Sequence, residues 1–170
     1  THPTLIKFDY GDKGKPRLTN SAVEFNLSHA KDWAYFGIND SIPLGIDLEF
    51  MRPPADHGWI DIAKLFFAPA EFKIQSALPV DIQAEAFFCC WTQKEAYIKL
   101  HGIGLSLPLD QFTVNVDPTS PAQLLTTTWN PLDLGQTRLY HLEAPRSYRA
   151  SVALRSVTPI NITYHQFINR

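Results

Sequence analysis

The sequence is short of cysteine and has no long apolar run, and each shortage excludes a class of protein. Its two cysteines, Cys89 and Cys90, are adjacent, and neighbouring side chains on a helix point in different directions, which suits a disulfide poorly. We therefore expect two buried free thiols in a reducing compartment and a cytoplasmic protein. No stretch approaches ~18 apolar residues, so no membrane-spanning helix is expected, and no signal-peptide pattern is seen.

Excess charge of either sign is also missing. The net charge is −2 over 170 residues, so no global field favours a nucleic acid or an anionic membrane as partner. No repeat, no low-complexity tract and no G-x-S-x-G elbow of a serine hydrolase is found. Five of the histidines have no spacing typical of a metal site: His2, His57, His101, His141 and His165. The chain has a normal globular composition, with 45% hydrophobic and 19% charged residues, and its length suits one ordinary domain or two small ones.

The order of the predicted elements indicates an α+β fold, with helices grouped in the middle and strands at both ends. The first four predicted strands form an antiparallel meander around a Gly- and Lys-rich turn at 11–16. Predicted strands lie at 5–10, 23–30, 33–38, 44–50, 112–116, 123–129, 137–142 and 148–154, and predicted helices at 59–67, 68–78 and 81–102, with a Pro-containing loop at 51–58.

The stretch "LGIDLEF" (44–50) is a strand pattern that carries two carboxylates. Residues two apart in a strand share a face, so Gly45, Asp47 and Glu49 lie together, opposite four apolar side chains. Like charges on one face repel each other. Either the face is fully solvated or a positive group lies beside it.

The predicted helix at 81–102 is the clearest element, and Gly102 is suited to end it. Its apolar face consists of Ala86, Phe87, Cys90, Trp91, Tyr97 and Ile98. Lys94 falls inside this face, where an unpaired ammonium is costly unless the side chain reaches out to water. Glu95 and Lys99 lie four residues apart at its edge, which is also the spacing of an ordinary surface ion pair.

Together, Asp47, Glu49 and Glu95 could form a hard-cation site, because Mg²⁺ prefers carboxylate oxygens, water and substrate phosphates. Ser28 and His29 are candidate phosphate ligands, since a hydroxyl and a chargeable imidazole suit an anion. The turn at 11–16 offers Lys13, Lys15 and free backbone N–H groups for an anion, although a solvated hairpin explains it equally well.

Four strings in this order resemble the Sfp-type 4′-phosphopantetheinyl transferases of bacteria. They are "GKP" (14–16), "FNLSHA" (25–30), "GIDLE" (45–49) and "WTQKEAYIKLHGIGLSLPL" (91–109). The last two are the most specific, since the family pairs G-[IV]-D-[ILV]-E with W-[TS]-x-K-E-[AS]-x-x-K. The resemblance runs from about residue 5 to residue 116 and more loosely to the end.

The resemblance implies transfer of the 4′-phosphopantetheine arm of coenzyme A to a serine of an apo acyl, aryl or peptidyl carrier protein, with release of adenosine 3′,5′-bisphosphate. It implies Mg²⁺, with Mn²⁺ as the alternative metal. The roles it implies are metal binding by Asp47, Glu49 and Glu95, catalysis by Glu95 and Lys99, coenzyme A binding by Lys15, Pro16, Ser28, His29 and Lys99, and site support by Trp91 and Lys94.

The family fold is a pseudo-dimer of two α+β halves with coenzyme A between them. By this resemblance, 1–43 is the C-terminal part of the first half, and 44–170 is the second half with the metal site. The first part of the family fold has no counterpart here, so we expect it to have been removed or to be supplied by a separate chain or partner. We also expect an exposed apolar surface where that part would pack.

A carrier would dock by an acidic helix, and the segment 51–78 is the predicted docking region. It combines Arg52, Lys64 and Lys73 with the apolar side chains of Trp59, Ile62, Phe66 and Phe67, although these could equally be core residues. Two other functions stay open. One is a truncated, catalytically weak module that binds carrier protein or coenzyme A, and the other is a Mg²⁺-dependent phosphohydrolase.

Overall fold

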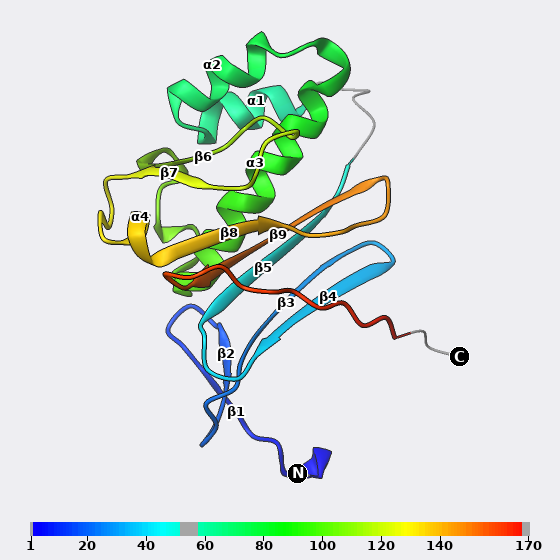
Figure 1. Cartoon of the computed structure of the whole chain (residues 1–170), viewed down its shortest axis with the longest axis vertical. Coiled ribbons are helices and arrows are strands. Elements are labelled where there is room, and N and C mark those ends of the chain that lie inside the picture. The colour runs from blue at the N-terminus through cyan, green and yellow to red at the C-terminus, as the bar shows by residue number, and fades with distance from the viewer. Residues whose placement is uncertain (1, 52–57, 168–170) are drawn as a thin grey trace.

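The computed structural model describes residues 2–51 and 58–167, and it has an α+β architecture with its longest helices in the middle of the chain (Figure 1). The strands before the helices are β1 (Phe8–Tyr10), β2 (Pro16–Leu18), β3 (Glu24–Ala30), β4 (Trp33–Asn39) and β5 (Leu44–Phe50). The helices α1 (Gly58–Phe66), α2 (Pro69–Ala77) and α3 (Val80–His101) follow, and then β6 (Phe112–Val114), β7 (Leu124–Thr127), α4 (Asp133–Gln136), β8 (Thr137–His141) and β9 (Tyr148–Arg155). The predicted fold class is confirmed.

The three predicted helices are confirmed, and so is the end of the longest one. α3 ends at Gly102, which has a left-handed φ of 66°, and its N–H bonds back to the carbonyl of Ile98. Pro69 stands in the first turn of α2, where its missing N–H costs nothing. The predicted strand at 5–10 is shorter, since only Phe8–Tyr10 is a strand and Pro3–Leu5 is a 3₁₀ turn. The predicted loop at 51–58 lies almost wholly outside the described residues.

The central sheet has the order β5-β9-β8, and all of its pairs are antiparallel. The prediction of a meander is right for the β3–β4 hairpin and wrong for β5, which pairs with β9 and not with β4. The opposite edge of β5 is covered by β3 in another way. The backbone N–H groups of Ile46 and Leu48 donate to the side chains of Asn26 and Ser28, so side chains replace a backbone ladder there.

Helix α3 lies against one face of β5 and β9, and Gly45 makes this close approach feasible. A Cβ atom at Gly45 would lie 2.2 Å from the carbonyl oxygen of Ala96 and 2.2 Å from the nitrogen of Leu100. The glycine of "LGIDLEF" is therefore needed to bring the helix backbone onto the strand. It sets the distance between the carboxylates of β5 and the side chains of α3.

The opposite face of the sheet is apolar. Leu44, Ile46, Val152 and Leu154 form a buried cluster there, and Ile160 and Ile162 of the C-terminal segment pack against it. Figure 1 shows this segment running across the sheet and past the β3–β4 hairpin. With both of its faces covered, β5 holds its two carboxylates in a fixed place.

Apolar side chains are exposed among the described residues, and that the first part of the family fold would pack on them stays a prediction. On the outer side of the β3–β4 hairpin, Leu27, Phe36 and Ile38 are 43%, 67% and 71% exposed.

None of the described helices is both long enough and apolar enough to span a membrane.

Candidate functional site

Asp47 is the centre of the candidate site. It lies on the α3-facing side of β5 and is only 3% exposed. Its Oδ1 accepts hydrogen bonds from the Lys99 ammonium at 2.6 Å and from the Ser28 hydroxyl at 3.1 Å. Its Oδ2 is buried and has no hydrogen-bond partner. Burial raises the pKa of the carboxyl, and the charge of Lys99 opposes that rise.

Glu95 faces the same space from α3. Burial raises its pKa to about 7, and the negative charges of Asp47 and Glu49 add to the rise while Lys99 opposes it. No hydrogen bond to the Glu95 carboxylate is found within 2–51 and 58–167. Glu95 is thus a carboxylate whose protonation changes near neutral pH, which is a property of catalytic acids and bases.

The three predicted metal ligands come to one region but do not form a closed metal cage. Glu49 lies two residues from Asp47 on the same face of β5, and it contributes to the raised pKa of Glu95. Among the described residues, no three His, Cys, Asp or Glu side chains are arranged to hold a metal ion. The donor set nevertheless fits a hard cation, because it is made of carboxylate oxygens and one of these is buried without a partner.

Ser28 and His29 point to opposite sides of β3. The Ser28 hydroxyl is buried, donates to Asp47, and accepts from Lys99 and from the N–H of Leu48, each at 3.1 Å. His29 is exposed on the other face of the strand. The two predicted phosphate ligands are therefore separated by strand alternation, and only Ser28 belongs to the Asp47 cluster.

Lys15 lies near the end of the predicted turn at 11–16 and is tied to β5 and α3. Its ammonium donates to the carbonyl oxygens of Leu44 at 2.8 Å and Leu100 at 3.1 Å. Burial lowers its pKa to about 8. The turn itself is confirmed, since the N–H of Gly11 donates to the carbonyl of Lys15 and Gly14 has a φ of 82°. Pro16 begins β2 opposite Tyr10.

Lys15, Glu95 and Lys99 line a cavity of about 260 Å³. Its lining includes three lysines, the carboxylate of Glu95, and three glycines that leave the backbone accessible to a ligand. The lining consists of Lys13, Gly14, Lys15, Asn26, Leu27, Glu95, Ile98, Lys99, Gly102 and Gly104. A cavity with several ammonium groups next to carboxylates suits an anionic ligand accompanied by a cation.

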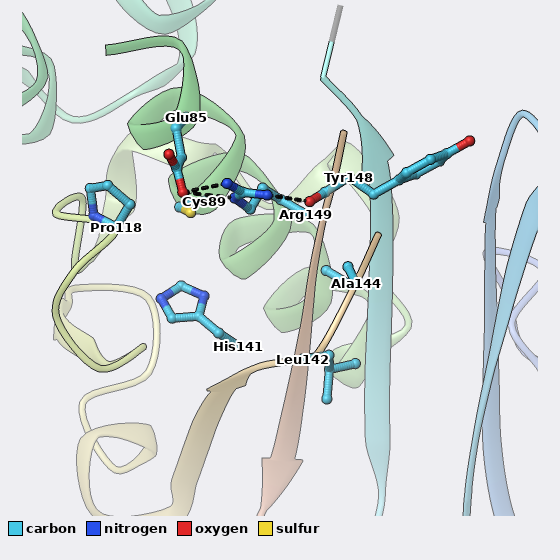
Figure 2. Close-up of a pocket in the computed structure, with 9 residues that line it drawn as sticks. Glu85, Cys89, Pro118, His141, Leu142, Ala144, Tyr148 and Arg149 are labelled. Carbon is cyan, nitrogen blue, oxygen red and sulfur yellow. Dashed lines mark hydrogen bonds and ion pairs between the residues drawn. The ribbon is translucent and has the colours of Figure 1, made fainter. Parts of the chain in front are cut away.

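A second cavity, of about 210 Å³, contains none of the predicted site residues (Figure 2). In it, the Arg149 guanidinium donates to the Glu85 carboxylate and to the backbone carbonyl of Tyr148. Cys89 also lines this cavity, and burial raises the pKa of its thiol to about 11. Both cysteines are buried and free, as expected, and such a thiol is a poor nucleophile.

Lys94 and Trp91 belong to the core and not to the cavity. Lys94 is fully buried, forms an ion pair with Glu71 at 2.8 Å, and donates to the carbonyls of Leu109 and Phe112 at 2.7 Å. The alternative that Lys94 reaches out to water does not hold, since its ammonium is buried with Glu71. Sequence reasoning missed Glu71, and its only signal was the buried lysine that needs a counter-charge. Trp91 stacks on Phe87 with ring centroids 5.8 Å apart.

The alternative interpretation of Glu95 and Lys99 as an exposed ion pair does not hold. Lys99 forms its ion pair with Asp47, and its side chain is 29% exposed. Two separate predictions, a carboxylate on strand 44–50 and a cation on helix 81–102, therefore meet in a single contact.

Comparison with known proteins gives a consistent result over the same region. Residues 43–153 match the model of the 4′-phosphopantetheinyl transferase superfamily. The chain is 39% identical over 137 residues to the 4′-phosphopantetheinyl transferase HetI of Nostoc sp. (strain PCC 7120), covering 78% of this chain and 56% of that protein. It is 43% identical over 115 residues to a 4′-phosphopantetheinyl transferase of Bacillus subtilis, covering 67% of this chain and 49% of that protein.

One solved structure, a Chronobacterium ammoniagenes ACPS–CoA complex, aligns with a TM-score of 0.45 and 18% identity, over 68% of this chain and 98% of that one. The chain spans about half the length of the curated relatives it matches.

Proposed function

Because the chain belongs to the 4′-phosphopantetheinyl transferase superfamily, we propose that it transfers the 4′-phosphopantetheine arm of coenzyme A to a serine of an apo carrier protein. The observation that carries this proposal is the contact between Asp47 and Lys99 beside Glu95, whose pKa is about 7. All three side chains lie within the matched region. They supply the charges that a reaction at a pyrophosphate needs.

The bonds change as follows in the proposed reaction. The serine oxygen of the carrier forms a bond to the phosphorus next to pantetheine, and the bond from that phosphorus to the bridging oxygen breaks. Adenosine 3′,5′-bisphosphate leaves with the electron pair. Glu95 is the group that accepts the serine proton, directly or through a water molecule, because its carboxylate lines the cavity.

Charge on the leaving group is stabilised by lysines. Lys99 and Lys13 line the same cavity as Glu95, and ammonium groups placed at a developing negative charge lower the barrier. Lys15 has two of its three donors on backbone carbonyls, so its contribution is mainly to hold the turn at the cavity. His29 is proposed to contact coenzyme A from the outer face of β3.

Asp47, Glu49 and Glu95 are the residues that would hold Mg²⁺, or Mn²⁺ in its place. When bound, such an ion supplies Lewis-acid stabilisation of pyrophosphate charge. The support for these ligands is the unpartnered, buried Oδ2 of Asp47 and the raised pKa of Glu95. A buried carboxylate oxygen without a partner is costly to leave uncompensated.

The carrier is proposed to dock on α1 and α2. Ile62, Leu65 and Phe66 are 39%, 74% and 40% exposed, and the exposed Lys64 and Lys73 lie on the same two helices. An apolar patch with basic neighbours suits an acidic amphipathic helix. Phe67 belongs to the core instead, where it stacks on Phe87, and Arg52 lies outside the described residues.

The test is the intact mass of an apo carrier protein after incubation with the chain, coenzyme A and Mg²⁺. A mass gain of one phosphopantetheine supports the proposal. Asp47→Asn is expected to reduce the rate about 100-fold or more, as for other charge-stabilising groups. Glu85→Gln is the matched control, because it also neutralises a carboxylate, but one that pairs with Arg149 at the other cavity.

Two further arms separate the remaining alternatives. Release of adenosine bisphosphate without a carrier would indicate the phosphohydrolase. Calorimetric binding of coenzyme A or of the carrier without any mass gain would indicate a binding module.

A further inference from the structure

Lys99 has an unusual position for a lysine that serves a phosphate. Its ammonium lies 2.6 Å from Oδ1 of Asp47, a proposed metal ligand, and donates to the Ser28 hydroxyl as well. The second oxygen of Asp47 is buried and without a partner. One carboxylate therefore has an ammonium on one oxygen and no hydrogen-bond partner on the other.

We propose that Lys99 competes with the divalent cation for Asp47, and that a phosphate ligand relieves this competition by drawing the ammonium away. The proposal rests on the proposed function of the same site. It makes Lys99 a positioning residue in addition to a phosphate contact. The metal and the phosphate ligand then bind with positive coupling, and each tightens the other by the same factor.

The competition follows from charge. Asp47 carries one negative charge, and an ammonium and a divalent ion on the same buried carboxylate repel each other strongly where water is excluded. The ammonium also fixes the rotamer of the carboxylate through its bond to Ser28. A metal ion that needs Oδ2 and a neighbouring carboxylate must bind against both effects.

The release follows from position. The Lys99 side chain is 29% exposed and lines the cavity together with Lys13 and Lys15. Its flexible stem allows the ammonium to turn from Asp47 towards an anion in that cavity. By contrast, Lys15 is held by two carbonyls, so Lys99 is the lysine in this lining that contacts a carboxylate and can exchange it for a phosphate.

The experiment measures Mn²⁺ binding to the chain by the loss of the free Mn²⁺ electron paramagnetic resonance signal, at pH 8 so that a proton does not replace the lysine on Asp47. Lys99→Met is expected to bind Mn²⁺ about ten-fold more tightly than the unmodified chain, the scale of one charged hydrogen bond. Lys99→Arg keeps the pair and is expected to stay within about two-fold. Lys13→Met, which removes a charge from the same cavity without touching Asp47, is the matched control and should also stay within about two-fold.

A second measurement adds coenzyme A, with Mn²⁺ and coenzyme A alone as the blank. Coenzyme A should tighten Mn²⁺ binding to the unmodified chain by a larger factor than to Lys99→Met, in which only the direct attraction between the ion and the pyrophosphate remains. Equal or weaker Mn²⁺ binding by a folded Lys99→Met would overturn the inference and leave the proposed function standing. Absence of Mn²⁺ binding in every variant would overturn the metal site itself. Lys99→Gln replaces Lys99→Met if the methionine variant does not fold.

Discussion

Lys94 and Lys99 lie five residues apart on α3, and the difference between their surroundings distinguishes a structural ion pair from the pair at the candidate site. Each pairs with a buried carboxylate, Lys94 with Glu71 at 2.8 Å and Lys99 with Asp47 at 2.6 Å. Around Lys94 every donor has a partner, since the ammonium also bonds two backbone carbonyls. Around Lys99 one carboxylate oxygen has no partner.

The carboxylates repeat this difference. Glu71 accepts hydrogen bonds from the N–H groups of Ala68 and Val114 in addition to its ion pair, and so it ties α2 to β6. Asp47 and Glu95 have raised pKa values because burial is not fully compensated. A fully satisfied buried pair stabilises one conformation, whereas a partly satisfied pair keeps the capacity to bind a ligand.

The largest expected effect comes from breaking the satisfied pair. Lys94→Met leaves Glu71 buried without its counter-charge and is expected to lower the free energy of unfolding by about 3–5 kcal/mol. Lys99→Met should cost about 1 kcal/mol, because its pair is partly exposed and the carboxyl can take up a proton instead. Urea unfolding of both variants measures the difference. Equal losses for the two lysines would contradict the comparison.

The sequence predicted the bounds of α3 and the position of Lys94 on it, but not the partner of Lys94. The 3.6-residue pattern located α3 and placed Lys94 inside its apolar face, and Gly102 marked its end. The partner of Lys94 could not be predicted, because Glu71 lies in a short helix with no distinctive charge pattern. The carboxylates of 44–50 and the charges of 81–102 were predicted to meet, but that one oxygen of Asp47 stays unpaired depends on atomic packing.

The next effect tests how the unsatisfied site is held. Gly45→Ala places a Cβ 2.2 Å from two backbone atoms of α3, and backbone cannot move aside as a side chain can. We expect a loss of about 2–3 kcal/mol in the free energy of unfolding. Gly135→Ala is the control, since nothing lies within 4 Å of its Cβ position in α4, and it should be neutral or slightly stabilising. A neutral Gly45→Ala would mean that α3 does not press on β5.

Strand pairing shows where sequence reasoning fails. The pairing of the predicted strands at 23–30 and 33–38 is confirmed as the β3–β4 hairpin, because a hairpin is local. The partner of β5 is β9, about a hundred residues later, with Asp47 opposite Ser151. Nothing local specifies such a pair, and the polar Asn26 and Ser28 of β3 give no sign that they cap the β5 edge.

A smaller effect is the pH dependence of stability that the buried carboxylate of Glu95 should cause. The pKa of Glu95 is raised from 4.5 to about 7 in the folded chain, so the folded state binds more protons than the unfolded state between these values. The stability contributed by this group is present below pH 4.5 and is lost as the pH rises through 7. The free energy of unfolding of Glu95→Gln should therefore be about 2 kcal/mol higher than that of the unmodified chain at pH 8, and the two should be equal near pH 4. A constant difference across this range would mean that Glu95 is not buried against Asp47.

The smallest effect concerns Ser28 and His29, which are neighbours in sequence on opposite faces of β3. His29 is exposed, so His29→Ala should leave folding unchanged and raise the KM for coenzyme A about three- to ten-fold, with kcat within about two-fold, because its contact is already made in the ground state.

Ser28→Ala removes the hydroxyl that accepts from Lys99 and Leu48 and donates to Asp47. This variant should therefore have a lower free energy of unfolding, and its kcat should change by a larger factor than its KM. If both variants changed KM alone, Ser28 would contact the ligand as His29 does. The hydrogen bonds among Ser28, Asp47 and Lys99 would then not be needed to position Lys99. If His29→Ala changed nothing, the outer face of β3 would lie outside the coenzyme A site, and the site would be confined to the cavity between the turn and α3.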